Sequence, residues 1–185
     1  MHRSSCTALA AMAGLAIAAV ALSPSAALGT GEAISRFEAV QTETYRHTHP
    51  GFTLQYPYEL RTSTPTRKGE VFSASGPSRV PSLNVMVLPR PADLPLAQAA
   101  QAAAKQLAPN GTIKAQRAVD LGGVAGEELV LEWSMPVGMG VELRSVQVSA
   151  FHGDAWVVAT VTDGRAGDAM AAPLSAAANS LRFTQ

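Results

Sequence analysis

The sequence is nearly free of cysteine, and its one thiol lies close to the start of the chain, at Cys6. A lipoprotein signal needs its cysteine after the apolar run, at the cleavage point, whereas Cys6 precedes that run. We therefore expect no lipid anchor. Once the segment that carries Cys6 is removed, the mature chain has no thiol, so neither a disulfide framework nor a thiol nucleophile is expected.

The chain also lacks an excess of either charge: Lys and Arg number 14, as do Asp and Glu. No basic cluster exceeds the pair Arg67-Lys68. A nucleic-acid or anionic-lipid surface needs a basic patch, so neither partner is expected.

Motifs for catalysis are missing as well. No Gly-x-Ser-x-Gly elbow occurs, and Gly122, Gly123 and Gly126 do not have dinucleotide-binding spacing. These glycines are interpreted as turn chemistry. We expect no enzyme and no cofactor.

One long apolar run is present, from Ala8 to Leu22. Arg3 precedes it, Ser23-Pro24 ends it, and small residues follow at Ser25-Ala26-Ala27, which is the layout of a cleavable secretory signal. The alternative, a retained membrane anchor, is disfavoured because the run is short for a span of about 20 residues. Residues 1–27 are thus predicted to be a signal peptide, and the mature protein to be periplasmic or secreted, with no stable membrane anchor.

The remaining chain predicts a leader over residues 28–50 and one domain over residues 51–185. Alternation and apolar runs predict strands, while apolar stripes predict two helices, the first with Asp93 as its N-cap. Gly122-Gly123 and Gly153-Asp154 are typical of tight hairpin turns. The expected strands are 52–56, 71–75, 83–88, 112–120, 124–135, 141–151 and 156–162, and the expected helices are 96–107 and 170–181.

Strands joined by short turns run antiparallel, and strands that are apolar on both faces need cover on both sides. The expected fold class is therefore α+β: an antiparallel sheet of about six to seven strands flanked by helices on both faces, an α/β/α sandwich.

The opening Gly51-Phe52-Thr53-Leu54-Gln55-Tyr56-Pro57, the Gly-Gly hairpin and the closing Ser180-Leu181-Arg182-Phe183 together resemble the PsbP-like superfamily, which includes Mog-type proteins and exported bacterial DcrB-like members. Tyr58-Glu59-Leu60 replaces the bulky aromatic residue usual after the Tyr-Pro pair, and the chain departs from the lipoprotein form common among bacterial members. The resemblance implies a non-catalytic accessory or binding protein, and it carries over no catalytic residue.

The histidines suggest a hypothesis of metal-ion binding. His47 and His49 would project to one side of an extended chain, and His152 with Asp154 could add ligands if the fold brought the two segments together. The competing interpretation is that the three histidines are solvated.

Two other features are candidates for contacts. Glu128 and Glu132 lie on one strand face, where Glu142 and Arg144 of the adjacent strand could pair with them. This is interpreted as a solvated or loosely covered polar patch, or else as a binding surface. The loop 136–140 carries Val137 and Met139, which are candidate partner contacts, or else belong to an ordinary hairpin connection.

The sequence therefore predicts an exported non-catalytic accessory or protein-binding module of the cell envelope, with an envelope protein as partner. A small-molecule or divalent-metal-binding periplasmic protein is the alternative, and a hydrolase is less favoured. Neither the partner nor the oligomeric state follows from the sequence.

Overall fold

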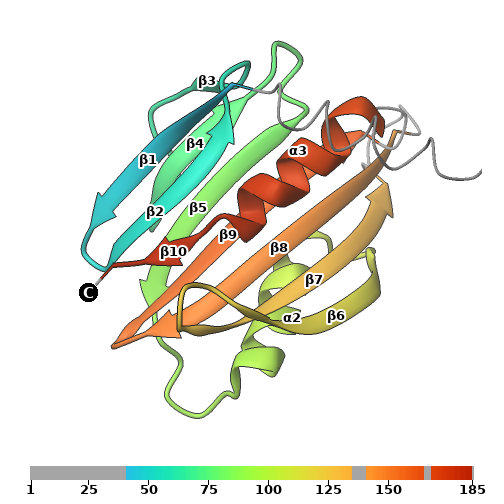
Figure 1. The fold of residues 1–185 in the computed structure, drawn as a ribbon. Coiled ribbons are helices and arrows are strands. Elements are labelled where there is room, and N and C mark those ends of the chain that lie inside the picture. Colours follow the sequence, from blue (N-terminus) through green and yellow to red (C-terminus); the bar gives the residue numbers. More distant parts are fainter. Residues whose placement is uncertain (1–40, 135–140, 165–167, 185) are drawn as a thin grey trace, which may run out of the picture.

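A computed structural model describes residues 41–134, 141–164 and 168–184. They form two antiparallel sheets and two helices (Figure 1). The large sheet has seven strands in the order β3-β4-β5-β9-β8-β7-β6, and the small sheet has the order β1-β2-β10. The bounds are β1 Thr42–Thr48, β2 Gly51–Pro57, β3 Arg61–Thr62, β4 Glu70–Ser75, β5 Ser82–Pro89, α2 Leu96–Leu107, β6 Thr112–Asp120, β7 Ala125–Ser134, β8 Glu142–His152, β9 Ala155–Gly164, α3 Asp168–Asn179 and β10 Arg182–Phe183.

The main core lies between one face of the large sheet and a layer made by α3 and the small sheet. Strand residues alternate between faces, so Val146, Val148 and Ala150 of β8 all point to this core. Phe52 and Leu54 of β2 meet them, and both are fully buried.

A smaller core lies on the opposite face, where α2 packs against β7 and β8. Ala100, Ala104 and Ala108 along α2 and its C-terminal end contact Leu129 and Leu131 of β7. The small alanine side chains let the helix lie close to the sheet, because no large side chain separates their backbones.

The antiparallel α+β prediction is confirmed, but the simple α/β/α sandwich, one sheet with helices alone as its outer layers, is not supported. The strand that begins at Gly51 belongs to a separate small sheet, which shares one face of the large sheet with α3 (Figure 1). On the other face α2 packs mainly on β7 and β8. The reason is that the apolar side chains of β2 fill the core beside α3, so a second sheet completes the layer that α3 begins.

Residues 42–48 were expected within a leader, yet they form β1, which pairs with β2 along its whole length. Tyr45 and His47 are its inward-facing residues, and the Tyr45 ring packs on Phe72 at 4.6 Å between centroids. The predicted signal peptide, residues 1–27, lies outside the described residues.

The start of α2 also differs from its prediction. The N-cap is Pro95 rather than Asp93, and no side chain caps the helix. Pro95 already fixes an extended backbone before Leu96, so the helix begins there without a carboxylate.

Candidate functional site

His47, the first proposed metal ligand, is engaged within the chain. Its Nδ1 lies 3.1 Å from the Tyr45 hydroxyl, and its Nε2 lies 3.0 Å from the His49 carbonyl oxygen. Its ring also packs on Phe52, with 5.0 Å between centroids. With both ring nitrogens occupied, this side chain is a structural part of the β1–β2 hairpin.

The other three candidates are split between two places. His152 stacks on Phe183 at 4.7 Å between centroids. His49 and Asp154 line one open hollow of about 510 Å³, walled by Pro50, Val87, Leu88, Pro89 and Ala155. Within the described residues, no group of three or more His, Cys, Asp or Glu side chains could hold a metal ion.

The proposed contact residues Val137 and Met139 lie outside the described residues. The strands that lead to them, β7 and β8, are described up to Ser134 and from Glu142.

Glu128 is buried rather than solvated, which corrects the expectation of a solvated patch. Arg117 of β6 donates to both of its oxygens, at 2.7 and 3.1 Å, and Asn179 of α3 donates to Oε2 at 2.6 Å. Burial would raise the pKa of Glu128, but the hydrogen bonds from Arg117 and Asn179 and the charge of Arg117 lower it below its ordinary value. Because all these partners come from the chain itself, Glu128 is a structural anchor. The predicted cross-strand pair of Glu132 with Arg144 is present in the register of β7 and β8.

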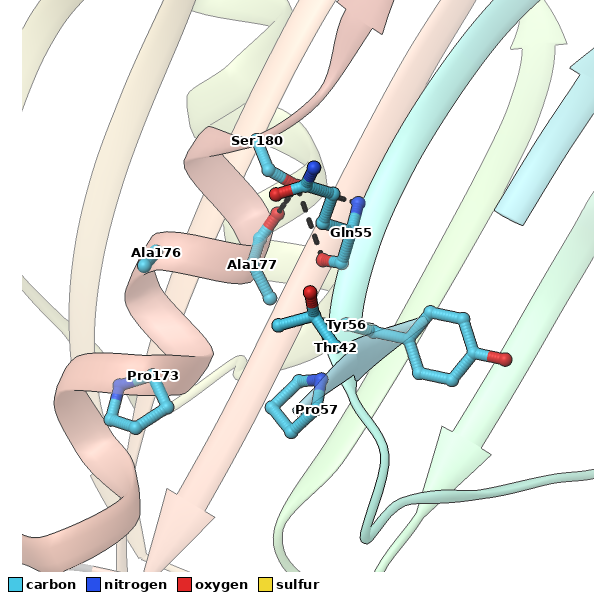
Figure 2. A pocket seen from close by; sticks show the side chains of 8 residues that line it. All are labelled: Thr42, Gln55, Tyr56, Pro57, Pro173, Ala176, Ala177 and Ser180. Atoms are coloured by element: carbon cyan, nitrogen blue, oxygen red, sulfur yellow. Dashed lines mark hydrogen bonds between the residues drawn. The ribbon is translucent and has the colours of Figure 1, made fainter. Parts of the chain in front are cut away.

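A small groove lies between β2 and α3. Figure 2 shows Thr42, Gln55 and Pro57 on the strand side of this groove and Pro173, Ala176, Ala177 and Ser180 on the other side, while the Tyr56 ring points away from α3. The Ser180 hydroxyl accepts from the Gln55 backbone N–H at 2.8 Å and contacts the Gln55 carbonyl oxygen at 3.1 Å. The cavity of about 30 Å³ has room for a water molecule or two, so it is not a ligand site.

The outer edge of β6 is exposed. This strand ends the order of the large sheet, and of its nine residues only Ile113 and Val119 are not exposed. The Leu121 N–H donates to the Val124 carbonyl across the hairpin turn. Alternation along an antiparallel ladder then places the backbone N–H of Ala118 on the outer edge, away from β7.

An apolar hollow of about 320 Å³ adjoins the start of β6. It opens between α2 and the β6–β7 hairpin and is lined by Ala104, Lys105, Ala108, Gly111, Thr112, Ile113 and Leu131. A free strand edge thus runs beside a place for an apolar side chain.

A second open surface, which we name the hydroxyl face, lies on the α2 side of the large sheet beyond the reach of α2. All its members are partly exposed, uncharged and hydrogen-bonding: Ser73 and Ser75 of β4, Ser82 and Asn84 of β5, and Thr160 and Thr162 of β9. Sequence reasoning missed it, although the signal was present: in each strand the two polar residues flank one buried apolar residue, as Ser73 and Ser75 flank Ala74.

These elements form a known architecture. No protein-family model matches the chain, and no curated protein sequence matches it. Among solved structures, the solution structure of cyanobacterial PsbP from Synechocystis sp. PCC 6803 aligns over 78% of this chain and 94% of its own, with a TM-score of 0.62 and 14% identity. The fold is PsbP-like.

A second PsbP-like structure is that of LpqN, a protein involved in cell envelope biogenesis of Mycobacterium tuberculosis. It aligns over 80% of this chain and 92% of its own, with a TM-score of 0.56 and 15% identity. At these identities the likeness concerns the fold. In the part of the chain that the structure describes, no helix is long and apolar enough to cross a membrane.

Proposed function

We propose that this chain is an exported, non-catalytic accessory module of the cell envelope that binds another protein along the outer edge of β6. The observation that carries the proposal is the free edge of β6 beside the apolar hollow. Strand addition gives affinity through backbone hydrogen bonds, while a neighbouring pocket selects a side chain.

The register of β6 limits where a partner strand can pair. A bulge lies between Ile113 and Ala115, so the regular part of the edge runs from Ala115 to Asp120. Lys114 and Arg117 are bound to Glu132 and Glu128 of β7, which keeps their charges on the sheet. A partner strand that continues past Ala115 reaches the hollow at Ile113.

Two further observations support an envelope location. The apolar run followed by Ser25-Ala26-Ala27 predicts export. The PsbP-like fold is shared with LpqN, which is described as involved in cell envelope biogenesis. PsbP-like proteins, which the sequence resembles, act mostly by contacting other macromolecules.

The test is site-specific photocrosslinking in cells that export the protein. A photoreactive residue at the exposed Thr112, beside the hollow, is expected to capture one reproducible partner. Ala118→Pro removes an outward N–H and is expected to abolish that capture, because proline cannot donate to an added strand. Ala118→Ser keeps the N–H and should leave the adduct intact.

A photoreactive residue at Thr44 on the edge of β1 serves as the positional control. If the same proteins are captured from Thr44 and from Thr112, or if Ala118→Pro leaves the Thr112 adduct unchanged, binding at the β6 edge is wrong.

A divalent cation at His49 and Asp154 is the second candidate, because these two side chains line one hollow. Two protein ligands leave the remaining coordination to water, so binding would be weak. Zinc is expected to raise the melting temperature of the protein. The double variant His49→Ala, Asp154→Asn is expected to lose that rise. An equal rise in the double variant contradicts this candidate.

A further inference from the structure

The hydroxyl face has a regular layout. Ser75, Ser82 and Thr162 are direct cross-strand neighbours in one row, and Ser73, Asn84 and Thr160 form the adjacent row. Neighbouring strands lie about 4.8 Å apart and alternate residues about 6.8 Å apart, so the two rows cover about 10 by 7 Å. This is a flat platform rather than a pocket.

Much of the hydrogen-bonding capacity of this platform is unused. Asn84 Nδ2 donates to Glu70 Oε1 at 2.8 Å and to Ser73 Oγ at 3.1 Å, which holds the amide in one orientation. Within residues 41–134, 141–164 and 168–184, the hydroxyls of Ser75, Ser82 and Thr160 make no hydrogen bond. Each can donate once and accept twice, and a ligand that brings both donors and acceptors satisfies them best.

An aromatic side chain borders the platform. Trp133 Nε1 donates to Ser145 Oγ at 3.0 Å, and Ser145 Oγ lies 2.9 Å from Thr162 Oγ1. The partly buried Trp133 ring is thereby fixed next to the row that contains Thr162. An indole ring offers an apolar face with a polar handle, which suits the C–H face of a sugar ring.

Charge narrows the choice of ligand. None of the six residues is charged, and the Glu70 carboxylate at the border is already held by Asn84 and by the backbone N–H groups of Thr66 and Arg67. Arg61, the exposed cross-strand neighbour of Ser75, is a single cation at one corner of the platform, which is too few to hold an anionic polymer by charge. A protein interface of this size is expected to contain apolar or arginine anchors, which these two rows lack.

We propose that the hydroxyl face binds a neutral, hydroxyl-rich polysaccharide chain. The ligand lies flat across β4, β5 and β9 and exchanges hydrogen bonds with Ser75, Ser82 and Thr160. Sheet faces serve oligosaccharide binding in other folds, such as the OB-fold. The face is distinct from the β6 edge, so this inference does not depend on the partner protein proposed above.

The test is an NMR titration of the mature protein with three probes: cellohexaose, maltohexaose and the hexamer of N-acetylglucosamine, with oligogalacturonate as the anionic comparison. At least one neutral probe is expected to bind with a Kd on the order of 1 mM. Its amide shifts should map to β4, β5 and β9, and the anionic probe should produce weaker shifts.

Two variants test the site itself. Ser82→Lys places a long cation on the platform and is expected to weaken binding by at least about tenfold. Thr160→Val removes one hydroxyl while keeping the branched shape, and several-fold weaker binding is expected. Two controls lie on the small sheet: Thr53→Val repeats the Thr-to-Val change, and Thr44→Lys likewise replaces a hydroxyl residue by lysine. Both should leave binding unchanged.

Three results would each overturn the inference. The first is no amide shifts with any neutral probe at about 10 mM, and the second is shifts that map outside β4, β5 and β9. The third is that both Thr160→Val and Ser82→Lys bind the sugar with the affinity of the wild type. Ala118→Pro should leave the sugar titration intact and Ser82→Lys should leave partner capture intact, so the failures of the two proposals are distinguishable.

Discussion

Asn179, the last residue of α3, donates a 2.6 Å hydrogen bond to the buried carboxylate of Glu128 in β7. The same carboxylate receives two hydrogen bonds from Arg117 on β6. The Glu128 side chain therefore joins the end of α3 to β6 and β7, the two strands at one edge of the large sheet.

Glu128→Gln is expected to lower the free energy of unfolding by about 1–3 kcal/mol near neutral pH, because a charge-assisted pair is lost and Arg117 keeps its charge. Chemical denaturation measures the change. Glu127→Gln, the same substitution at the preceding position, is the control and should cost far less.

The pH dependence of stability tests the same group. The pKa of Glu128 is lowered in the folded state, so its contribution is present above the ordinary value of 4.5 and is lost as the pH falls through the lowered pKa. Glu70 acts in the same direction: burial would raise its pKa, but hydrogen bonds from Thr66, Arg67 and Asn84 lower it. The wild type should therefore lose stability in acid more steeply than Glu128→Gln, and parallel curves would refute the assignment to Glu128.

Ser180→Ala is expected to destabilise the domain by about 1 kcal/mol, because the Gln55 N–H at the edge of β2 loses its acceptor. Thermal or chemical unfolding checks this. Ser175→Ala, in the last two turns of α3 just before Ser180, is the control for the substitution itself, since the Ser175 side chain makes no hydrogen bond within the described part of the chain. Equal effects of the two substitutions would show that the Ser180 bond makes no specific contribution.

Gly126→Ala is expected to cost about 1–3 kcal/mol by overpacking. A Cβ at this position would lie 2.6 Å from Leu121 Cδ1 and 3.1 Å from the Ser149 carbonyl oxygen. Ala125→Ser changes the exposed neighbour by a similar volume and should be tolerated. An unchanged unfolding midpoint for Gly126→Ala would mean that Leu121 moves aside freely.

The phenol of Tyr56 should titrate unusually late. Burial, the hydrogen bond to Glu43 and the charge of Glu43 raise the pKa of Tyr56 to about 12. A raised pKa favours the neutral form in the folded state, so this stabilisation is complete below the ordinary value of 10.0 and is lost as the pH rises toward about 12. Burial also raises the pKa of Tyr45, so ultraviolet difference titration should show a late transition of which Tyr56→Phe removes the Tyr56 part. Glu43→Gln should bring the transition to lower pH, and a transition that stays in place would contradict the role of Glu43.

The strongly periodic segments could be predicted from the sequence. The helix over Leu96–Leu107 and the strand over Thr112–Asp120 have the expected bounds, since both end at clear turn residues. The antiparallel order followed from the short turns at Gly122-Gly123 and Gly153-Asp154. Local pattern and local geometry agree at these places.

Relationships between distant segments could not be predicted in this way. β1 is an edge strand with only Tyr45 and His47 turned inward, so its alternation is weak, and β10 has two residues. Glu128 looked solvated because its partners, Arg117 and Asn179, come from other elements. The hydroxyl face was missed because each strand contributes only two polar residues, and their common platform exists only once β4, β5 and β9 are in register.

The pairing of β2 with β10 has a consequence for the order of assembly. Gln55 and Ser180, which join β2 to the residue after α3, are 125 positions apart, and Arg182 and Phe183 then pair with Thr53 and Phe52. Closing such a long loop costs conformational entropy before these contacts can form, so we expect them to form late in folding. The small sheet can therefore be completed only after nearly the whole domain is available to fold, so any chain that emerges from its N-terminus spends most of its emergence without this closure.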